Sequence, residues 1–279
     1  MGVYCFVMRP LRITKPNSTF QVIQALKENR SKRSELGEVF VEGVAAIKGA
    51  VRAGKSITRI VYHNHETLSD WSKQLLKAHE HAQLISLEKT LFDMLSDRNE
   101  PSELLVTIAR ETVELEQVTL PEKPLVVVLD RPGNRGNLGS IIRSANAFGT
   151  DLIITSGHGV DPFDPAVIRA STGGIFFTKV CHVESVEKLS RWIGTARMEH
   201  AGLTVIGTDS ESDVSLAKSS LVQRPVVLLI GNEARGLSVR LKSMADKMIR
   251  IPMSGEVDSL NVACAASIIL YEVYKASRR

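Results

Sequence analysis

Two stretches near the end of the chain decide the fold: LLIGNEARGLS at residues 228–238 and IRIPMSGEVDSLNVACAASIILYEVYK at residues 249–275. Each begins as a short aliphatic run typical of a buried strand and then changes to small and polar residues. The second loop leads into the apolar segment 260–274, which predicts a buried helix. In an open α/β sheet, two adjacent strands that end in such loops form a crevice for a ligand. We therefore expect a binding site between these two loops.

The same alternation of aliphatic runs and helical segments extends back to residue 125. Strands are predicted at 125–129, 151–155, 175–180, 203–208, 226–230 and 247–251. Strands that are aliphatic throughout and separated by helices are typical of a mostly parallel sheet with helices on both faces. The predicted fold class of residues 125–279 is therefore α/β.

A second, smaller α/β domain precedes this one in the sequence. Residues 1–16, interrupted by two prolines, are interpreted as an N-terminal extension. Residues 17–110 alternate short strands and helices over the length of a small independent domain, with the basic stretch 30–37 as a turn. Residues 111–124 are acidic and contain two prolines, which favours a linker.

The composition excludes several classes of protein. The chain is 43% hydrophobic and 24% charged, as in globular proteins, and no run approaches the roughly 18 apolar residues of a membrane span. The first residues contain no long apolar core or small-residue cleavage site, so we expect no secretory signal. The three cysteines, odd in number and unpaired in spacing, indicate reduced thiols in the cytoplasm. The pairs His63/His65 and His79/His81 have no further ligands beside them, so no metal site is predicted. We expect a cytoplasmic protein without membrane association.

The basic charge of the protein is concentrated at its N-terminal end. Residues 1–60 contain eleven Lys or Arg against four Glu and no Asp, a balance of +7, whereas the whole chain carries +4. The remaining residues therefore sum to −3. Clustered positive charge suits a phosphate backbone, although it is also compatible with a solvated face. Aromatic residues are few in this segment, so base stacking is not indicated.

Polar residues follow the predicted strands of the C-terminal domain. The loop RPGNRGNLGSIIR at 131–143 has three glycines, but not in the spacing of a dinucleotide loop, and the next strand ends in Thr155-Ser156 rather than an acidic residue. A nicotinamide-dependent oxidoreductase is therefore disfavoured. Asn137 lies near the start of the following helix, and Arg143 lies among aliphatic and small residues rather than on a charged face.

Each of these candidates also has a purely structural explanation. Arg143 could form an ion pair on a helix surface. Glu233 could cap a helix that starts near Leu237, and Ser259 or Asn261 could be the N-cap of the C-terminal helix. Taken singly, the motifs do not decide between these alternatives.

Taken together, the motifs resemble a known family. N-x-G-x-x-x-R from Asn137 to Arg143, the IGNEARG loop and IPMSGEVDSLNV resemble the three motifs of the SpoU/TrmH family, RNA ribose 2′-O-methyltransferases of the SPOUT class. The resemblance covers residues 125–275, and FVEGVAAI at 40–47 more loosely resembles the family's substrate-binding domain. The family's loop runs Asp-Pro-x-Asn, whereas here RPGNRG separates Asp130 from Asn137. Asn134 is thus a rival for the motif position, and the distance to Arg143 favours Asn137.

The resemblance implies a deep trefoil knot in the C-terminal domain, a homodimer and S-adenosylmethionine as cofactor. The positions that match the family's cofactor site are Thr208, Gly231, Ile251 and Leu260. The positions that match its catalytic motifs are Arg143, Asn137, Glu233, Ser259 and Asn261. The interface of the dimer is expected to include the apolar helix after Ser259.

The chemistry of methyl transfer constrains the roles of these residues. A guanidinium keeps its proton in proteins, so Arg143 is expected to bind the target phosphate and stabilise developing alkoxide charge rather than act as a base. Asn137, Ser259 and Asn261 would hold the ribose, and Glu233 would orient Arg143 or neighbouring amides. Ribosomal RNA, in particular 23S, is the expected substrate. A transfer RNA methyltransferase and a non-catalytic ribosomal RNA-binding protein are the alternatives.

Overall fold

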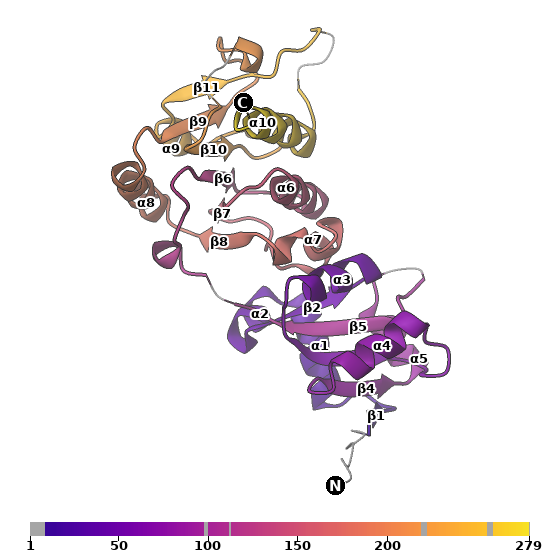
Figure 1. The fold of residues 1–279 in the computed structure, drawn as a ribbon. Coiled ribbons are helices and arrows are strands. Elements are labelled where there is room, and N and C mark those ends of the chain that lie inside the picture. Colours follow the sequence, from indigo (N-terminus) through magenta and orange to yellow (C-terminus); the bar gives the residue numbers. More distant parts are fainter. Residues whose placement is uncertain (1–8, 98–99, 112, 219–221, 256–258, 279) are drawn as a thin grey trace. The chain divides into compact units, whose positions relative to one another are not determined.

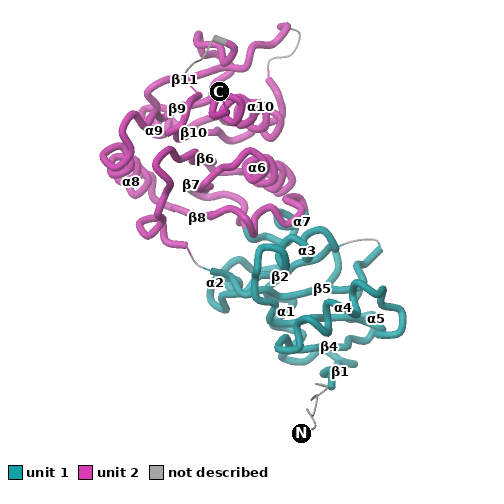
Figure 2. The backbone as a smooth tube through the Cα atoms, in the orientation of Figure 1, with its two compact units in different colours: residues 1–111, 163–169 teal, residues 112–162, 170–279 magenta. Residues whose placement is uncertain are grey.

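Two sheets, one in each half of the chain, organise the computed structural model (Figure 1). The structure describes residues 9–97, 100–111, 113–218, 222–255 and 259–278. It divides into a first unit of residues 1–111 and 163–169 and a second unit of residues 112–162 and 170–279 (Figure 2). The segment 163–169, which the sequence placed in the C-terminal domain, is thus grouped with the first unit. Residues 1–8 of the predicted extension and 256–258 of the third motif lie outside the described residues.

A five-stranded mixed sheet forms the first unit. Its strands are β1 (Leu11–Ile13), β2 (Glu38–Glu42), β3 (Ile57–Tyr62), β4 (Gln83–Leu87) and β5 (Leu104–Ala109), in the order β1-β4-β3-β5-β2. Strands β1, β4 and β3 run parallel, and β5 is antiparallel to both β3 and β2. The helices are α1 (Ser18–Glu28), α2 (Arg30–Leu36), α3 (Val44–Arg52), α4 (Asp70–Ala78) and α5 (Lys89–Leu95). Part of the predicted extension is therefore an edge strand, which is held by the buried side chain of Ile13.

The basic stretch 30–37, predicted as a turn, is a short helix, α2. The side chain of Asn29 caps its first turn, and Gly37 ends it in the left-handed conformation with φ of +61°. Its Arg33 is buried and donates through Nη1 to the carbonyl oxygen of Leu26, 2.9 Å away. The prediction was wrong because the charge of this stretch gave no sign that one arginine would be folded inward.

A six-stranded sheet forms the second unit. Its strands are β6 (Leu125–Asp130), β7 (Leu152–Ser156), β8 (Lys179–Val183), β9 (Thr204–Thr208), β10 (Val226–Ile230) and β11 (Lys247–Ile249), in the order β11-β9-β10-β6-β7-β8. All five pairings are parallel, which confirms the predicted parallel sheet. From β6 the chain continues toward β7, whereas from β10 it continues toward the opposite edge. The boundary between these two strands is the point where ligands bind in such sheets.

Helices cover both faces of this sheet, as the sequence predicted (Figure 1). On one face, Leu189, Ile193 and Ala196 of α8 (Val186–Glu199) pack against strand residues such as Val126 and Val227. On the other face lie α6 (Arg135–Ala147) and α10 (Val262–Ala276), which are joined by a 2.7 Å hydrogen bond between the Ser144 and Ser267 hydroxyls. The second unit also contains the short helix α9 (Val239–Lys242), whereas most of α7 (Pro165–Ala170) is grouped with the first unit. The trefoil knot that the resemblance implies stays a prediction.

The third strand of this sheet is displaced from its predicted position. The sequence placed it at 175–180, whereas β8 spans Lys179–Val183 and follows a 3-10 turn at Gly174–Phe176. Gly173 enters this turn with φ of +82°, and Ile175 and Phe176 are buried in it. The apolar run IFF was misread because aliphatic and aromatic residues in a buried turn have the same composition as a strand.

The predicted linker 111–124 is partly packed against the second unit. It contains a 3-10 turn at Leu115–Gln117, and Leu115 is buried in the core beside Cys181. The Cys181 thiol contacts the carbonyl oxygen of Val113 at 3.2 Å, and burial raises the pKa of this thiol to about 11. The acidic composition of the segment favoured an exposed linker and did not indicate these apolar contacts.

The described residues contain neither a candidate membrane-spanning helix nor a metal-binding cluster. None of their helices combines the length and the hydropathy needed to cross a bilayer. They also contain no group of three or more His, Cys, Asp or Glu side chains placed to hold a metal ion.

Candidate functional site

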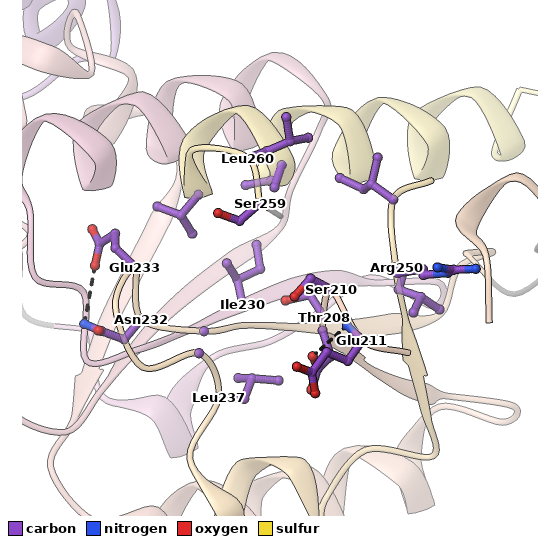
Figure 3. Close-up of a pocket in the computed structure, with 18 of the residues that line it drawn as sticks. Thr208, Ser210, Glu211, Ile230, Asn232, Glu233, Leu237, Arg250, Ser259 and Leu260 are labelled. Atoms are coloured by element: carbon purple, nitrogen blue, oxygen red, sulfur yellow. Dashed lines mark hydrogen bonds between the residues drawn. The ribbon is translucent and has the colours of Figure 1, made fainter. Parts of the chain in front are cut away.

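A pocket of about 480 Å³ opens at the carboxyl ends of β9, β10 and β11, against the start of α10 (Figure 3). All four residues predicted to bind the cofactor line it: Thr208, Gly231, Ile251 and Leu260. Glu233 and Ser259, predicted as catalytic, line it as well. The two sequence stretches that predicted a crevice therefore do form one wall each of the same cavity.

The pocket is apolar in its middle and polar toward its ends. Ile230, Leu237 and Leu260 supply apolar surface in its middle, with Glu233 at one end and Glu211 toward the other (Figure 3). Asp209 and Lys242 also line the pocket and form an ion pair of 2.6 Å. The hydrogen bond from Lys242 is the main cause of a lowered pKa at Asp209. An apolar slot with polar groups at its ends is the usual form of a small-molecule site.

Gly231 allows the loop after β10 to fold back on itself. A Cβ atom at this position would lie 2.8 Å from Gly236 Cα, and closer still to the carbonyl carbon of Gly236 and the nitrogen of Leu237. Asn232 and Gly236 exchange two backbone hydrogen bonds of 3.0 and 2.9 Å across this loop. Only glycine fits where two backbone segments approach so closely.

Glu233 joins the loop after β10 to the loop after β6. Its carboxylate accepts hydrogen bonds from the backbone N–H groups of Gly133 and Asn134, at 3.1 and 3.2 Å. It also accepts from Nδ2 of Asn137 at 3.1 Å and from Nδ2 of Asn232 at 3.3 Å. The carboxylate therefore fixes the entry to α6 rather than capping the helix near Leu237. That helix, α9, is capped by Ser238.

Asn137 and Asn261 complete the network. Nδ2 of Asn261 donates to Oδ1 of Asn137 at 3.0 Å, while Oδ1 of Asn261 accepts the backbone N–H groups of Ala263 and Cys264 at 2.8 and 3.4 Å. Asn261 is thus both the N-cap of α10 and a partner of Asn137. The rival Asn134 has a different position, because its side chain caps α6 by accepting the Asn137 N–H at 3.0 Å.

Two residues that the sequence analysis did not select hold these loops in place. Asp130 is buried at the end of β6 and accepts the N–H of Ser238 at 2.7 Å, while it pairs with Arg131 at 2.8 Å. Asn232 donates through Nδ2 to the carbonyl oxygen of Arg131 at 2.7 Å. A carboxylate at the end of an otherwise aliphatic strand was the available signal for Asp130, and the loop position was the signal for Asn232.

Arg143 lies apart from this network. It is exposed on α6, does not line the pocket, and makes no hydrogen bond or ion pair within the described part of the chain. On a helix, residues six apart point about 120° from each other, so Arg143 and Asn137 project in different directions. The structure therefore brings together Asn137, Glu233 and Asn261 and leaves Arg143 exposed outside their network.

The ionisation of Glu233 should be visible in the stability of the fold. Burial alone raises the pKa of this carboxyl, but the hydrogen bonds from its own amide, Asn137, Gly133 and Asn134 outweigh burial, and the pKa is lowered from 4.5. A lowered folded-state pKa stabilises the fold above about pH 4.5, and this stabilisation is lost as the pH falls through the folded value.

We expect Glu233→Gln to reduce the change in the free energy of unfolding with pH over this range. Chemical unfolding of both proteins between pH 6 and pH 3 measures the effect, and the difference between the curves isolates Glu233 from other acidic groups. The wild type should lose its advantage over the variant on acidification. If the stabilities of the two proteins changed in parallel with pH, the hydrogen-bond network around Glu233 would be contradicted.

These features define a parallel α/β domain with a ligand crevice at its switch point. A family model described as the SpoU rRNA Methylase family matches residues 124–271, and the SpoU L30e-like domain matches residues 17–106. The chain therefore belongs to the SpoU rRNA methylase family.

Similar proteins extend over nearly the whole chain. It is 37% identical to a 23S rRNA (uridine(2479)-2′-O)-methyltransferase of Streptomyces viridochromogenes, over 95% of this chain and 92% of the relative. The crystal structure of the SpoU methyltransferase AviRb from that organism, in complex with AdoMet, superposes with a TM-score of 0.87 at 36% identity, covering 93% of this chain and 98% of the other. An AdoMet-bound rRNA methyltransferase from Sinorhizobium meliloti superposes with a TM-score of 0.79 at 30% identity, covering 94% and 96%.

Proposed function

We propose that the protein methylates a ribose 2′-hydroxyl of 23S ribosomal RNA with S-adenosylmethionine as the methyl donor. It is an RNA methyltransferase, as its family membership shows. The observation that carries the proposal is the network of Asn137, Glu233 and Asn261 beside a pocket lined by the predicted cofactor residues. The 23S rRNA activity in the name of the Streptomyces relative supports this choice of RNA.

The pocket fits S-adenosylmethionine in size and chemistry. A volume of about 480 Å³ lies within the range of about 300–1,000 Å³ for sites of small ligands. Ile230, Ile251 and Leu260 offer apolar surface suited to an adenine ring, and Glu211 and Glu233 offer carboxylates suited to a cationic ligand. Residues Thr208 and Gly231 would bind the cofactor through the loops that follow their strands.

Alignment of the reacting groups is the main contribution expected from the protein. The cofactor supplies a methyl group that is already activated by a positively charged sulfur. Asn137 is held on both sides of its amide, by Glu233 and by Asn261, so it is preorganised to hold a ribose. Ser259, exposed at the rim of the pocket, would contact the same sugar. Arg143 would bind the adjacent phosphate bidentately and stabilise charge on the attacking oxygen.

A homodimer would cover the outer face of α10. The helix buries Ala263, Ala266, Ile269, Leu270 and Val273 in its own protomer. Its other side exposes Cys264, Ile268 and Tyr271, spaced so that they form one stripe, with Ile268 39% and Tyr271 49% exposed. Phe148, which directly follows α6, lies against Tyr271 with ring centroids 5.7 Å apart and extends the stripe. An apolar stripe of this kind is suited to pairing with a second copy.

The dimer would also give Arg143 a site of action. Its neighbour Ser144 bonds to Ser267 of α10, so a partner seated on the stripe would lie beside Arg143. Because Arg143 does not line the pocket of its own protomer, we propose that it acts on RNA bound between the two protomers.

Charge placed in the stripe should separate the protomers. We expect Ile268→Glu combined with Tyr271→Glu to reduce the mass in solution from twice 30.6 kDa to 30.6 kDa, because carboxylates would be buried without partners. Light scattering at micromolar concentration measures the mass. Met198→Glu is the matched control, since this side chain is 82% exposed on α8. A monomeric wild type would remove the proposal.

The function is tested by methyl transfer from labelled S-adenosylmethionine. Unmodified 23S rRNA transcribed in vitro should accept the label at one site, and mapping of 2′-O-methyl groups should locate it on a ribose. Single-stranded DNA of the same sequence lacks the 2′-hydroxyl and should accept none. Transfer to transfer RNA instead would favour that alternative, and RNA binding without transfer would favour a non-catalytic protein. Thermal stabilisation by NADH rather than S-adenosylmethionine would point to an oxidoreductase.

We also propose a cytoplasmic location. Both described cysteines, Cys181 and Cys264, are free thiols. Free thiols are typical of a reducing compartment.

A further inference from the structure

Most of the basic charge in residues 1–60 is engaged within the first unit. Ion pairs are formed by Lys27 with Asp97, Lys32 with Glu35, Lys55 with Glu111 and Arg59 with Glu38. Arg33 is buried, Lys48 lies over the ring of Trp71, and Arg30 and Arg52 also have partners. These cations are therefore poor candidates for contacts with another molecule.

The cations that remain are close together in the chain. Arg9, Arg12 and Lys15 are exposed and form no hydrogen bond or ion pair with any other residue that the structure describes. Arg12 lies in β1, the edge strand of the sheet, and the other two flank that strand. Ile13 is buried, and because side chains alternate along a strand, Arg12 points away from that core. The cations of residues 1–60 that have no partner among the described residues therefore lie at one edge of the sheet.

A groove of about 430 Å³ lies beside these cations. Its polar lining residues, here called the basic groove, are Arg9, Arg12, His63, Asn64, Ser86 and Glu88. They lie in β1 or just before it and at the ends of β3 and β4. Strands β1 and β3 both pair in parallel with β4, so the sheet sets the spacing of these residues (Figure 1). The His63 ring is held in place by a 3.3 Å contact between Nδ1 and the Leu87 carbonyl oxygen.

We propose that the basic groove binds the phosphate backbone of the substrate RNA, which rests on the proposed function. Two unpaired guanidiniums offer forked donors that match phosphate oxygens, and Asn64 and Ser86 offer further hydrogen-bonding groups. None of the lining residues is Phe, Tyr or Trp, so the groove lacks platforms on which unpaired bases stack. Backbone contacts of this kind hold the RNA in register without reading its sequence.

A glutamate in the groove allows a second test of the proposal, with an effect in the opposite direction. Glu88 is exposed at the cap position of α5, and its side chain makes no capping hydrogen bond. A carboxylate there repels a phosphate, so its removal should strengthen binding while the loss of an arginine should weaken it. Opposite effects of opposite charges in one groove are difficult to produce by general damage to the fold.

The test measures binding of unmodified 23S rRNA transcript at several salt concentrations, without cofactor. The double variant Arg9→Gln/Arg12→Gln should bind about tenfold more weakly near 0.1 M salt and should lower the slope of log affinity against log salt by about 1.4, since each contact to single-stranded phosphate contributes about 0.7. Glu88→Gln should bind more tightly than wild type. Lys77→Gln is the matched control, because it removes an exposed cation without an ion-pair partner among the described residues, from α4 of the same unit.

Each outcome either supports or overturns the proposal. In methyl transfer, the double variant should raise KM for RNA and leave kcat unchanged, because the groove contributes binding rather than chemistry. Equal salt slopes for the double variant and wild type, or an equal loss in Lys77→Gln, would overturn it. Measuring binding directly keeps this test separate from the proposed function. A wild type that binds RNA but transfers no methyl group would contradict the proposed function but not the proposal that the basic groove binds RNA. Thermal unfolding confirms that all variants fold.

Discussion

Replacement of Arg143 by alanine is expected to abolish methyl transfer while it leaves the affinity for S-adenosylmethionine within a few-fold of wild type. The guanidinium is exposed, does not line the pocket and has no partner within the described part of the chain, so its loss should not disturb the cofactor site. Removal of a single preorganised donor costs about 10²–10³-fold in other enzymes. Single-turnover methylation of 23S rRNA and titration of the cofactor measure the two quantities.

The conservative change at this position is the control. Arg143→Lys keeps the charge but should rescue little, because an ammonium cannot form the two parallel hydrogen bonds of a guanidinium. Near-normal activity in Arg143→Ala would mean that another cation acts. Arg131, which is bound to Asp130, and Arg135 would then be tested in the same way.

Replacement of Gly231 by alanine is expected to disable the cofactor site. The added methyl group would collide with the backbone at Gly236 and Leu237, so the loop after β10 would have to open. Because Glu233 lies in this loop, the displacement would also loosen the contacts to Gly133 and Asn137. A misplacement of about 1 Å can cost about 10²-fold in rate. Calorimetric titration with S-adenosylmethionine should show a corresponding loss of affinity.

Gly194→Ala is the matched control for this change. Gly194 lies within α8, and a Cβ atom there would meet nothing within 4 Å. Alanine is favoured over glycine in a helix by about 1 kcal/mol, so the control should bind cofactor normally and unfold at a slightly higher temperature. If Gly231→Ala bound cofactor as well as this control does, the close approach of the loop would have no functional role.

Strand positions and loop chemistry could be predicted where the sequence pattern was local. The predicted strand at 226–230 coincides with β10, because an uninterrupted aliphatic run has few other ways to be buried. The four positions predicted to bind the cofactor meet in one pocket because parallel strands place their following loops at the same edge of the sheet.

Features that depend on contacts distant in the sequence were not predictable. Glu233 was expected to orient Arg143 or neighbouring amides, and it does accept hydrogen bonds from amides. The sequence could not indicate that one of them belongs to Gly133, about one hundred residues away. The buried turn at 174–176 was taken for strand because its burial depends on packing rather than on periodicity. Charge counts located the basic end of the chain, but only the ion pairs separated Arg12 from Lys27.

Position 261 has little freedom to evolve. Its side chain must present an acceptor to Ala263 and Cys264 and, at the same time, a donor to Asn137. Aspartate would keep the helix cap but would face the Asn137 oxygen without a donor, and alanine would supply neither group. Serine would have a single hydroxyl on a shorter side chain. Selection for a folded C-terminal helix and selection for the orientation of the Asn137 amide therefore act on the same few atoms, so a substitution at this position changes both at once.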